Sequence, residues 1–544
     1  MNSEELARRR NLPADFLPLP RLIPSIIPNH PPILSFYSSN STIPLPSISL
    51  STPRKISDDF EIPPQNLLAI FHGTQQPAVS SAFQDAGFAV APRELQQQFN
   101  ICWGHPLGLD FYKTLSPGQL CGQFPGSNAI GRKDTMGQLL REMKLKWPQK
   151  YQFVPQTWII PDGLEEFREE AGEGFYIYKP AMASEGRGIE LIKRDSELPK
   201  GLDVPAVIQE YMDNLLIING FKFDIRLYVM VTSIDPLIFY IYDEGLGRFA
   251  THKYEKVNDG NFDDKTMHLT NFSINFKSDE FHMDGFPSKW KWTELLDYLD
   301  DNRQFFKAGS TILADTKKGA VKDYILKDVD ELIIKTLIGV EPRMHLFSHN
   351  AGLANVYPRR NFGLYGFDIM FTEAGEALLV EINKSPSKNT KTDLDVEIKY
   401  PLMVNTLNLL GYAPAFHQSG MAAVPERFAT EDEATIARFG GRLKSADCRQ
   451  YRPFRLENGE QKHSFKTGAD LRSFGTVPDL TRFERRVLWQ LVDEGARLGQ
   501  FRRLFPRGEA ADLELLGGER LLNHLCCWFV GQADGPEQLR AAGL

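Results

Sequence analysis

The segment NFGLYGFDIMFTEAGEALLVEINKSPS carries the residue types that could bind a metal ion. It predicts two strands joined by a tight turn at Ala374–Gly375. Pairing about that turn places Asp368 opposite Glu381, with Asn383 two residues further along the same side. Two facing carboxylates repel each other unless a cation or a proton lies between them. Together with the amide oxygen of Asn383, they supply the hard oxygen ligands that suit Mg²⁺, which also keeps positions for water and phosphate oxygens.

The other face of this predicted hairpin is apolar, which specifies the register of its two strands. The expected cross-strand pairs are Phe367 with Ile382, Ile369 with Val380, and Phe371 with Leu378. An exposed hairpin with an incidental acidic end is the alternative. The polar trio interrupts an otherwise apolar pair of strands, which favours the metal site.

A glycine-containing flap could contact phosphate groups. The strand FYIYK ends at Lys179, the loop MASEGRG follows, and IELIK predicts a returning strand. Backbone amides around Gly186 and Gly188 can approach a phosphate, and Lys179 would supply a point charge to it. Glycine-bearing hairpin loops are common, so a purely structural role is the alternative.

A strand with one charged side follows the flap. Apolar residues alternate with Lys222, Asp224 and Arg226 in FKFDIRLYV, and the chain is expected to turn at Asp235–Pro236. An edge strand with a solvated face is the alternative. Arg248 follows a predicted turn at EGLGRF, and VIQEYM (207–212) predicts a buried strand whose backbone could hydrogen-bond a purine edge.

The elements that would position these groups are predicted from apolar spacing and capping. The expected helices are one with Met136, Leu139, Leu140 and Met143 on one face, and others near 162–171, 288–299 and 328–341. The last is expected to stop at Pro342, and Thr481 with Glu484 forms a capping box. Arg132 and Lys133 precede the first helix, where cations oppose the helix dipole, so an anionic group nearby would help to explain them. His268 is expected to be a structural hydrogen-bonding residue, because no companion His or Cys lies at ligand spacing.

Composition bounds the class of protein. The chain has 544 residues, 42% of them hydrophobic and 24% charged, as in an ordinary soluble globular protein. No apolar run approaches the ~20 residues that span a bilayer, and the net charge of −8 argues against a general polyanion binder. Five cysteines without metal spacing or a disulfide framework favour a reduced cytoplasmic compartment. We expect a monomer that binds neither nucleic acid nor a membrane.

The motifs follow one another in an order that resembles an ATP-grasp enzyme, in which two α+β lobes clasp ATP. The segments GRKD, KPAMASEGRGI, INGFKFDIRLYV, EGLGRFA, MHLTNFSIN, YGFDIMF and LLVEINKSPS together resemble the tubulin tyrosine ligase-like family over about residues 120–412. FPGSNAIGRKD, EGLGRFA, LDVEIK and FRRLFP look most like its polyglutamylases.

This resemblance implies an α+β fold with an N-terminal domain (61–150), a central ATP-grasp domain (151–250) and a C-terminal ATP-grasp domain with the Mg²⁺ site (251–412). The composition predicts a disordered Pro/Ser-rich leader before it (1–60) and a helical, partly basic extension after it (413–544). The basic run from Arg438 to Arg455 is either a solvated face or a surface for an acidic partner.

The resemblance also implies roles for individual residues. The metal ligands would be Asp368, Glu381 and Asn383. ATP would be held by Lys179, Arg187, Gly188, Gln209, Glu210, Tyr211, Met212, Lys222, Phe223, Asp224, Thr270 and Asn271. Free glutamate or the acceptor would be contacted by Arg187, Arg248, Ser273, Lys289, Lys384 and Lys399, with Lys291 as the competing alignment for Lys289. Lys179, Lys222, Arg226 and Glu381 would act in catalysis.

The implied activity is ATP-dependent ligation of free L-glutamate to glutamate side chains of α/β-tubulin tails through an acyl phosphate. Microtubules, in the cytoplasm and cytoskeleton and at the cilium or basal body, would be the setting. The alternatives are a glutamylase of other acidic proteins, a tyrosine or glycine ligase of the same family, and an inactive microtubule-binding protein. Glu185 in the flap and Lys384 after the metal hairpin depart from the family's pattern. The first leaves open how the acceptor is bound, and the second leaves open whether the enzyme starts glutamate chains or lengthens them.

Overall fold

The computed structural model describes residues 16–23, 26–27, 33–37, 67–73, 75–91, 99–115, 119–183, 186–196, 205–270, 288–353, 361–412, 476–516 and 521–542. Glu185, Asn271, Ser273 and the basic run from Arg438 to Arg455 lie outside this set. Among the described helices, none combines the length and the apolar character that crossing a membrane requires.

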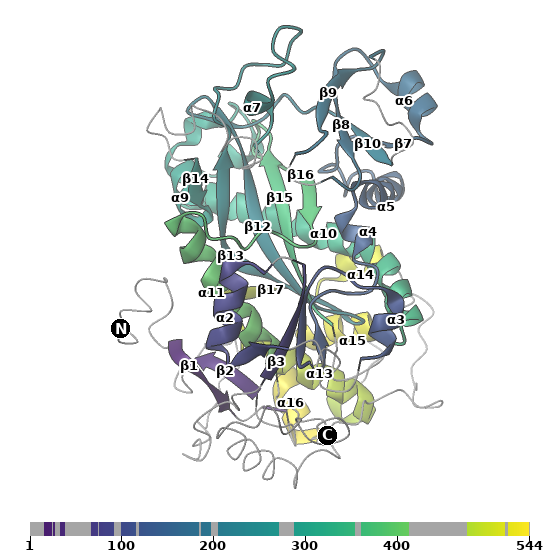
Figure 1. The fold of residues 1–544 in the computed structure, drawn as a ribbon, viewed down its shortest axis with the longest axis vertical. Coiled ribbons are helices and arrows are strands. Elements are labelled where there is room, and N and C mark those ends of the chain that lie inside the picture. The colour runs from purple at the N-terminus through teal and green to yellow at the C-terminus, as the bar shows by residue number, and fades with distance from the viewer. Residues whose placement is uncertain are drawn as a thin grey trace.

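An antiparallel seven-stranded sheet forms the centre of the molecule (Figure 1). Its strand order is β14-β13-β12-β15-β16, with β11 beside β12 and β17 beside β13. The bounds are β11 Ile217–Ile218, β12 Phe221–Ile234, β13 Leu237–Phe249, β14 Lys289–Lys291, β15 Gly363–Phe371, β16 Ala377–Asn383 and β17 Phe501–Phe505. The predicted α+β class is confirmed.

Both faces of strand β12 are covered, because its alternate residues enter two different hydrophobic cores. Leu227 and Val229 pack into one core with helices α5, α9 and α10. Tyr228 and Met230 point to the other face, where α2, α11, α13 and α15 pack. A strand covered on both sides carries no solvated face. The edge-strand alternative for the charged residues of β12 is therefore wrong.

Helices surround the central sheet. They are α2 Pro77–Asp85, α3 Leu109–Lys113, α4 Asn128–Gly131, α5 Lys133–Lys146, α6 Leu164–Glu170, α7 Lys265–His268, α9 Trp292–Asp301, α10 Ala320–Asn350, α11 Asp393–Leu410, α13 Arg482–Gly495, α14 Ala510–Leu516, α15 Leu521–Val530 and α16 Gly535–Ala542, with short 3-10 turns at Arg303–Phe305, Thr311–Leu313 and Val477–Asp479. The predicted capping box of Thr481 and Glu484 opens α13.

Smaller sheets lie beside the central one (Figure 1). One is antiparallel, in the order β7-β10-β8-β9, and contains the predicted flap as the pair β8 and β9. Another is parallel, in the order β4-β3-β5-β6, and a third pairs β1 with β2. The bounds are β1 Phe16–Ile23, β2 Ile33–Tyr37, β3 Leu67–His72, β4 Phe88–Val90, β5 Ile101–Gly104, β6 Leu120–Cys121, β7 Thr157–Ile160, β8 Phe175–Pro180, β9 Glu190–Lys193 and β10 Ala206–Glu210. Leu34 and Phe36 of β2 are buried in the hydrophobic core, so this strand of the leader packs against the rest of the fold.

The acidic hairpin is formed by β15 and β16, and half of its predicted register is correct. Asp368 lies opposite Glu381, and Phe367 opposite Ile382, as predicted. Beyond Asp368 the register shifts by one residue, so Ile369 pairs with Leu379 and Phe371 with Ala377. The shift is a β-bulge, which leaves one residue of β16 without a partner. The two expected pairs beyond the bulge are therefore wrong.

Three further expectations are corrected. Helix α10 continues through Pro342 because Met344, beyond the proline, is buried in the core, and this packing outweighs one lost backbone hydrogen bond. EGLGRF lies inside β13, whose register shift opposite β12 accommodates it without a turn. Residues 289–291 form strand β14 ahead of α9. Strand β17 was not expected in the helical extension, and it joins the central sheet.

Candidate active site

An open cavity, with about 760 Å³ of empty space that includes open solvent, lies between the flap sheet and the ends of β12, β15 and β16. One part of its wall is apolar, with Ile177, Met370 and Leu378 from both sheets. The predicted site residues that line it are Lys179, Gln209, Glu210, Tyr211, Met212, Lys222, Asp224, Thr270, Asp368 and Glu381. The cavity thus offers apolar surface for a ring and charged groups for an anion.

Two lysines at the cavity are almost fully buried. Lys179 donates to Gln209 Oε1 at 2.7 Å, and Lys222 to the Tyr211 hydroxyl at 3.1 Å. Burial lowers the pKa of Lys179 to about 8, against the opposing effect of Glu381. Burial, reinforced by Lys179, lowers the pKa of Lys222 to about 7. Because neither ammonium has a carboxylate within ion-pair distance among the described residues, a bound anion would stabilise both charges.

We expect these lysines to make the ligand-free protein more stable as the pH rises from about 7 to about 10. A lysine in an unfolded chain has a pKa of ~10.4, so over this window the unfolded state binds more protons and the free energy of unfolding increases with pH. The destabilisation by Lys222 is complete below its folded pKa of about 7 and disappears near the unfolded value. In Lys222→Met, the slope of unfolding free energy against pH should fall by up to ~1.4 kcal/mol per unit. Urea unfolding at three pH values measures this slope. Lys318→Met, which removes an exposed ammonium, is the control, and equal slopes for wild type and Lys222→Met would refute the expectation.

The metal hairpin meets two arginines from neighbouring strands. Arg226 on β12 holds the Asp368 carboxylate through both Nε and Nη2, the latter at 2.8 Å. Arg248 on β13 binds both oxygens of Asp224 at 2.6 Å and reaches Asp368 Oδ2 at 3.0 Å. Burial opposes ionisation of Asp368, but Arg226 and Arg248 outweigh it and lower its pKa to about 2. Asp368 is therefore an ionised carboxylate at any working pH.

Glycine at position 366 makes the approach of Arg226 possible. A Cβ on Gly366 would lie 2.9 Å from Arg226 Cδ and 2.7 Å from Pro386 Cβ. A larger residue would displace the guanidinium from Asp368.

The oxygen groups of the hairpin fit a hard divalent cation. The Asn383 amide nitrogen lies 3.3 Å from Asp368 Oδ2 and 3.1 Å from Glu381 Oε1, so it bridges the two carboxylates. An amide rotated by half a turn would present its oxygen at the same place, which makes three oxygen donors converge. The described residues contain no cluster of three or more His, Cys, Asp or Glu for a metal. Mg²⁺ usually binds only a few protein ligands, and phosphate and water oxygens complete its coordination shell.

A second group of cations lies on the other side of Arg248. Lys289 on β14 pairs with Asp395 at 3.0 Å, and Lys399 on α11 pairs with the same carboxylate at 2.7 Å. Lys289 also lies opposite Arg248 in the sheet register. Lys291, the competing alignment, pairs instead with Glu397 at 2.8 Å. Burial lowers the pKa of Lys399 to about 8, against the opposing effect of Asp395.

Some predicted residues lie away from the cavity. Phe223 is packed in the hydrophobic core against Phe249 and is not among the residues that line the cavity. Arg187 and Gly188 are exposed on the flap, and Lys384 donates to Asn128 Oδ1 at 2.6 Å on α4. Asn271 and Ser273 fall outside the described residues.

Two residues that the sequence did not single out for the site are part of it. Lys133, at the start of α5, lies 3.3 Å from Glu381 and donates to the Ala183 carbonyl of the flap at 2.9 Å. The anionic group expected near this helix start is thus Glu381, while Arg132 pairs with Asp134. The second such residue is Asp395, which pairs with both Lys289 and Lys399. In the sequence, only its position four residues before Lys399 on a helix could have indicated this contact.

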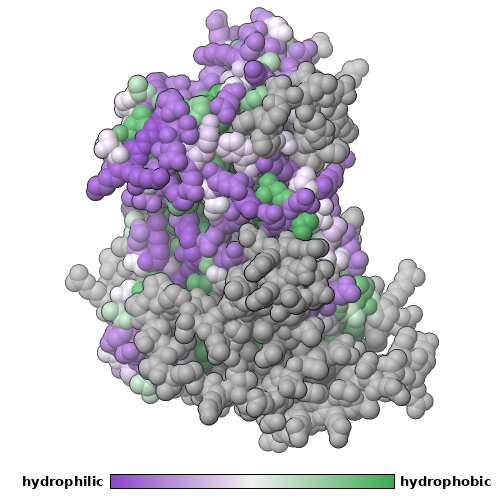
Figure 2. Space-filling view, turned by 90° about the vertical axis from the view of Figure 1, so that its left-hand side faces the viewer, coloured by the Kyte–Doolittle hydropathy of each residue, from purple (hydrophilic) through white to green (hydrophobic). Residues whose placement is uncertain are grey.

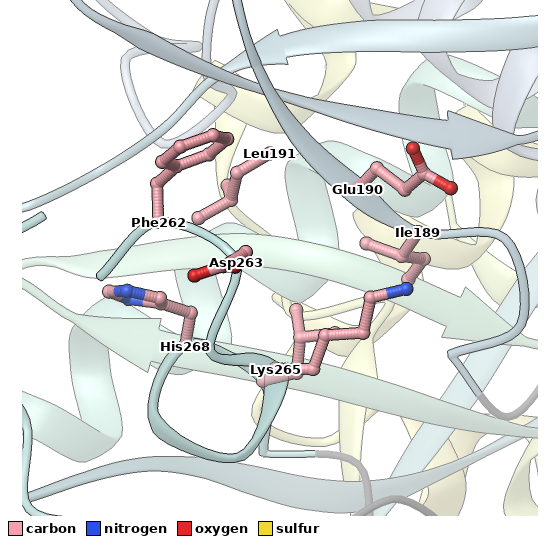
Figure 3. Close-up of a pocket in the computed structure, with 8 residues that line it drawn as sticks. Ile189, Glu190, Leu191, Phe262, Asp263, Lys265 and His268 are labelled. Carbon is pink, nitrogen blue, oxygen red and sulfur yellow. The ribbon is translucent and has the colours of Figure 1, made fainter. Parts of the chain in front are cut away.

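His268 lines both this cavity and a neighbouring pocket. Its Nδ1 lies 2.9 Å from the Tyr211 hydroxyl and its Nε2 lies 2.9 Å from the Asn261 carbonyl, which confirms its structural role. Figure 3 shows the neighbouring pocket, with Phe262, Asp263, Lys265 and His268 on one side and residues 189–191 of the flap on the other. Residues 189–191 of the flap therefore lie against the segment 262–268, whose last residue, His268, also lines the cavity.

The comparisons with known proteins agree with this architecture. The model of the tubulin-tyrosine ligase family matches residues 113–419, which is more than half of the chain. The chain belongs to this family. The assignment made from the sequence motifs is confirmed, and the matched range contains the described site residues named above.

Several family members with assigned activities are similar to this chain. The human tubulin monoglutamylase TTLL4 is 31% identical over 421 residues, covering 74% of this chain and 32% of the relative. The human tubulin polyglutamylase TTLL5 is 29% identical over 470 residues (82% and 34%), and the human tubulin polyglutamylase TTLL6 is 32% identical over 338 residues (61% and 36%). The chain spans about a third of the length of these curated relatives.

Proposed function

We propose that the protein is an ATP-dependent ligase that joins the amino group of L-glutamate to glutamate side chains on the C-terminal tails of tubulin. The names of its family relatives, which are tubulin glutamylases, support the reaction and the substrate. The observation that carries the proposal is the charge of the site. Cations outnumber carboxylates there. The cations are Lys133, Lys179, Lys222, Arg226, Arg248, Lys289 and Lys399, and the carboxylates are Asp224, Asp368, Glu381, Asp395 and the exposed Glu210. An excess of buried positive charge calls for anionic ligands.

The nucleotide would lie in the cavity with its ring against the apolar wall. Its phosphates would meet Lys179 and Lys222, whose ammonium groups have no carboxylate within ion-pair distance among the residues that the structure describes. Asp368, Glu381 and Asn383 would hold Mg²⁺, which would neutralise charge on the phosphate oxygens. Arg226 is fixed by Asp368 beside this position and would stabilise negative charge that builds up during transfer.

The proposed reaction has two steps. An acceptor carboxylate oxygen attacks the γ-phosphorus of ATP, ADP leaves, and an acyl phosphate forms. The amino group of free glutamate then attacks the acyl carbon, inorganic phosphate leaves, and an amide bond remains with loss of the amine protons to solvent. No protein nucleophile takes part, so the protein acts by positioning and by electrostatics.

The second group of cations would select the amino acid. Free glutamate carries two carboxylates, and each is best bound by charge-assisted hydrogen bonds. Arg248, Lys289 and Lys399 lie together and could supply these bonds. Glycine or tyrosine has a single carboxylate and would leave part of this charge unmatched.

We expect Lys289→Met to raise the KM for glutamate about tenfold, the cost of ~1.4 kcal/mol for one lost charge-assisted contact. The KM for ATP should stay within about twofold. Lys291→Met is the matched control, because Lys291 lies two residues away on the same strand and pairs with Glu397 outside the group. Steady-state kinetics with varied glutamate measures both variants. If Lys291→Met raises the KM for glutamate more than Lys289→Met does, then Lys291, and not Lys289, contacts the amino acid.

We further propose that the enzyme lengthens glutamate chains as a polyglutamylase, on the basis of the motifs quoted above. Its relatives include both a monoglutamylase and polyglutamylases. Mass spectrometry of tubulin tails after reaction separates the two, because a polyglutamylase adds several glutamates to one side chain. The substrate would place the protein at microtubules, including those of the cilium or basal body.

The test of the function is transfer of labelled amino acids. Purified protein with ATP, Mg²⁺, microtubules and labelled glutamate should label tubulin, and unlabelled glutamate should compete while glycine and tyrosine should not. Labelling with glycine or tyrosine instead would make it a different ligase of the family. Absence of transfer with every amino acid, together with retained microtubule binding, would indicate an inactive binding protein.

Figure 2 shows a face on which the coloured side chains are mostly hydrophilic. The large apolar side chains exposed among the described residues lie on four different segments and are Val90, Leu145, Met182 and Leu346. Recognition of the partner through charge is therefore favoured over an apolar contact, and it should weaken with added salt.

A further inference from the structure

A second cavity lies where the parallel N-terminal sheet meets the segment after β16. It holds about 690 Å³ of empty space and opens to solvent. Strands β3 and β5 end at it, with His72 and Trp103 in its wall, and Ser385 and Lys388 line the opposite side. The carboxyl ends of parallel strands are where open α/β sheets bind ligands. We call this cavity the Lys388 pocket.

Lys388 is the unusual feature of this pocket. The residue is 3% exposed, yet no described carboxylate lies within ion-pair distance of its ammonium, whose recorded contact is the Trp103 ring at 5.2 Å. Its backbone is fixed, since its N–H donates to Gln76 Oε1 at 2.7 Å and its carbonyl accepts from Ala78 N–H at 3.4 Å. Burial, together with Arg226 and Lys399, lowers the pKa of Lys388 to about 7. A buried ammonium without a counter-charge destabilises the fold, so an anionic ligand is the natural partner.

Other groups in the pocket also suit an anion. His72 Nε2 is buried and has no hydrogen-bond partner in the described part of the chain, and burial together with His105 lowers the pKa of His72. Helix α2 begins at the pocket, with Gln76 as its N-cap, so the positive end of its dipole faces the same space.

The Lys388 pocket and the metal hairpin share strand β15. Leu364 lines the pocket and Asp368 the catalytic cavity, four residues apart on β15, which is about 13 Å at ~3.3 Å per residue. Arg226 lies between them, since it holds Asp368 and also approaches Pro386 across Gly366. An extended peptide could therefore span both sites over three to five residues.

We propose that the Lys388 pocket binds a carboxylate of the acceptor chain, on an acidic residue three to five positions from the glutamate that is modified. This inference rests on the proposed function for the identity of the acceptor. The pocket would thus select which glutamate of an acidic tail reaches the catalytic cavity.

The test uses acceptor peptides that contain a single glutamate among glutamines, with one aspartate placed two to eight residues away. Binding is measured by fluorescence anisotropy with ADP present, and transfer by steady-state kinetics with mass spectrometry of the product. Wild-type protein should bind the peptide with matched spacing about tenfold more tightly than the peptide without aspartate. Lys388→Met should lose this preference with kcat within about twofold, and Lys388→Arg should keep it. Lys113→Met, which removes an exposed ammonium, is the control.

The melting temperature separates a binding role from a structural one. Lys388→Met should melt at the wild-type temperature or above, because an unpaired buried charge is removed. A lower melting temperature with the spacing preference retained would make Lys388 a structural residue and overturn the inference.

Two results with wild-type protein alone would also overturn it. One is equal binding at every spacing. The other is a preference that 1 mM free aspartate erases, which would make the pocket a site for small carboxylates. Active transfer without a spacing preference would refute the pocket and leave the proposed function standing. A spacing preference in binding without any transfer would refute the proposed function and leave the pocket.

Discussion

Glu381→Gln should lower the rate of glutamate transfer about a thousandfold, which is the scale of losing a group that organises charge at the reacting phosphate. The substitution keeps the shape of the side chain and removes the negative charge that faces Asp368 and Lys133. Without that charge the hairpin retains one carboxylate and one amide to hold a divalent cation. Transfer of labelled glutamate at saturating ATP and glutamate measures the loss.

Glu373→Gln is the matched control for this variant. Glu373 lies in the turn between β15 and β16 of the same hairpin and pairs with Lys307 at 2.7 Å, with both side chains largely exposed. Its substitution should leave the rate unchanged, and both variants should still bind microtubules. Transfer by Glu381→Gln at more than a tenth of the wild-type rate would remove Glu381 from the catalytic site.

Arg248→Ala should destabilise the fold by about 3–5 kcal/mol as well as abolish glutamate transfer. Arg248 is the partner of two buried carboxylates, since it binds Asp224 through two nitrogens and Asp368 through one. Removal of the guanidinium leaves Asp224, whose side chain is 4% exposed, with only the Thr270 hydroxyl at 2.7 Å as a described side-chain donor. Urea unfolding measures the loss of stability.

A second substitution distinguishes the two roles of Arg248. Asp224→Asn combined with Arg248→Ala removes the unpaired charge, so it should recover part of the stability without recovering transfer. If Arg248→Ala is as stable as wild type and only the KM for glutamate rises, the ion pairs with Asp224 and Asp368 contribute little, and Arg248 acts on the amino acid alone.

The sequence predicted the acidic hairpin because two local rules coincide there. The turn at Ala374–Gly375 and the apolar alternation near Phe367 both place Asp368 opposite Glu381, and the structure has this pair. The β-bulge after Asp368 could not be predicted, because both registers keep apolar residues on the core face: Leu378, Leu379 and Val380 are interchangeable in polarity.

Contacts between distant segments were the harder part of the site. Lys133 on α5 meets Glu381 on β16, and Lys289 on β14 meets Asp395 on α11. No local pattern in the sequence encodes which cation pairs with which distant carboxylate. The same limit explains helix α10, where a local rule for Pro342 predicted an end and tertiary packing of Met344 continues the helix. The sequence pattern of residues 66–94 is mixed and assigns no element, whereas the described part of this segment forms β3, α2 and β4, with both strands in the parallel sheet.

The central claim is that an acceptor carboxylate is activated by ATP in the cavity between the flap and the metal hairpin. An acceptor peptide labelled with ¹⁸O in its glutamate side-chain carboxyl tests this most directly, with mass spectrometry of the inorganic phosphate after ligation. Activation through an acyl phosphate predicts one labelled oxygen in each phosphate formed, and no transfer of label in Glu381→Gln. Phosphate free of ¹⁸O, formed at the same rate as the amide bond, would contradict the account.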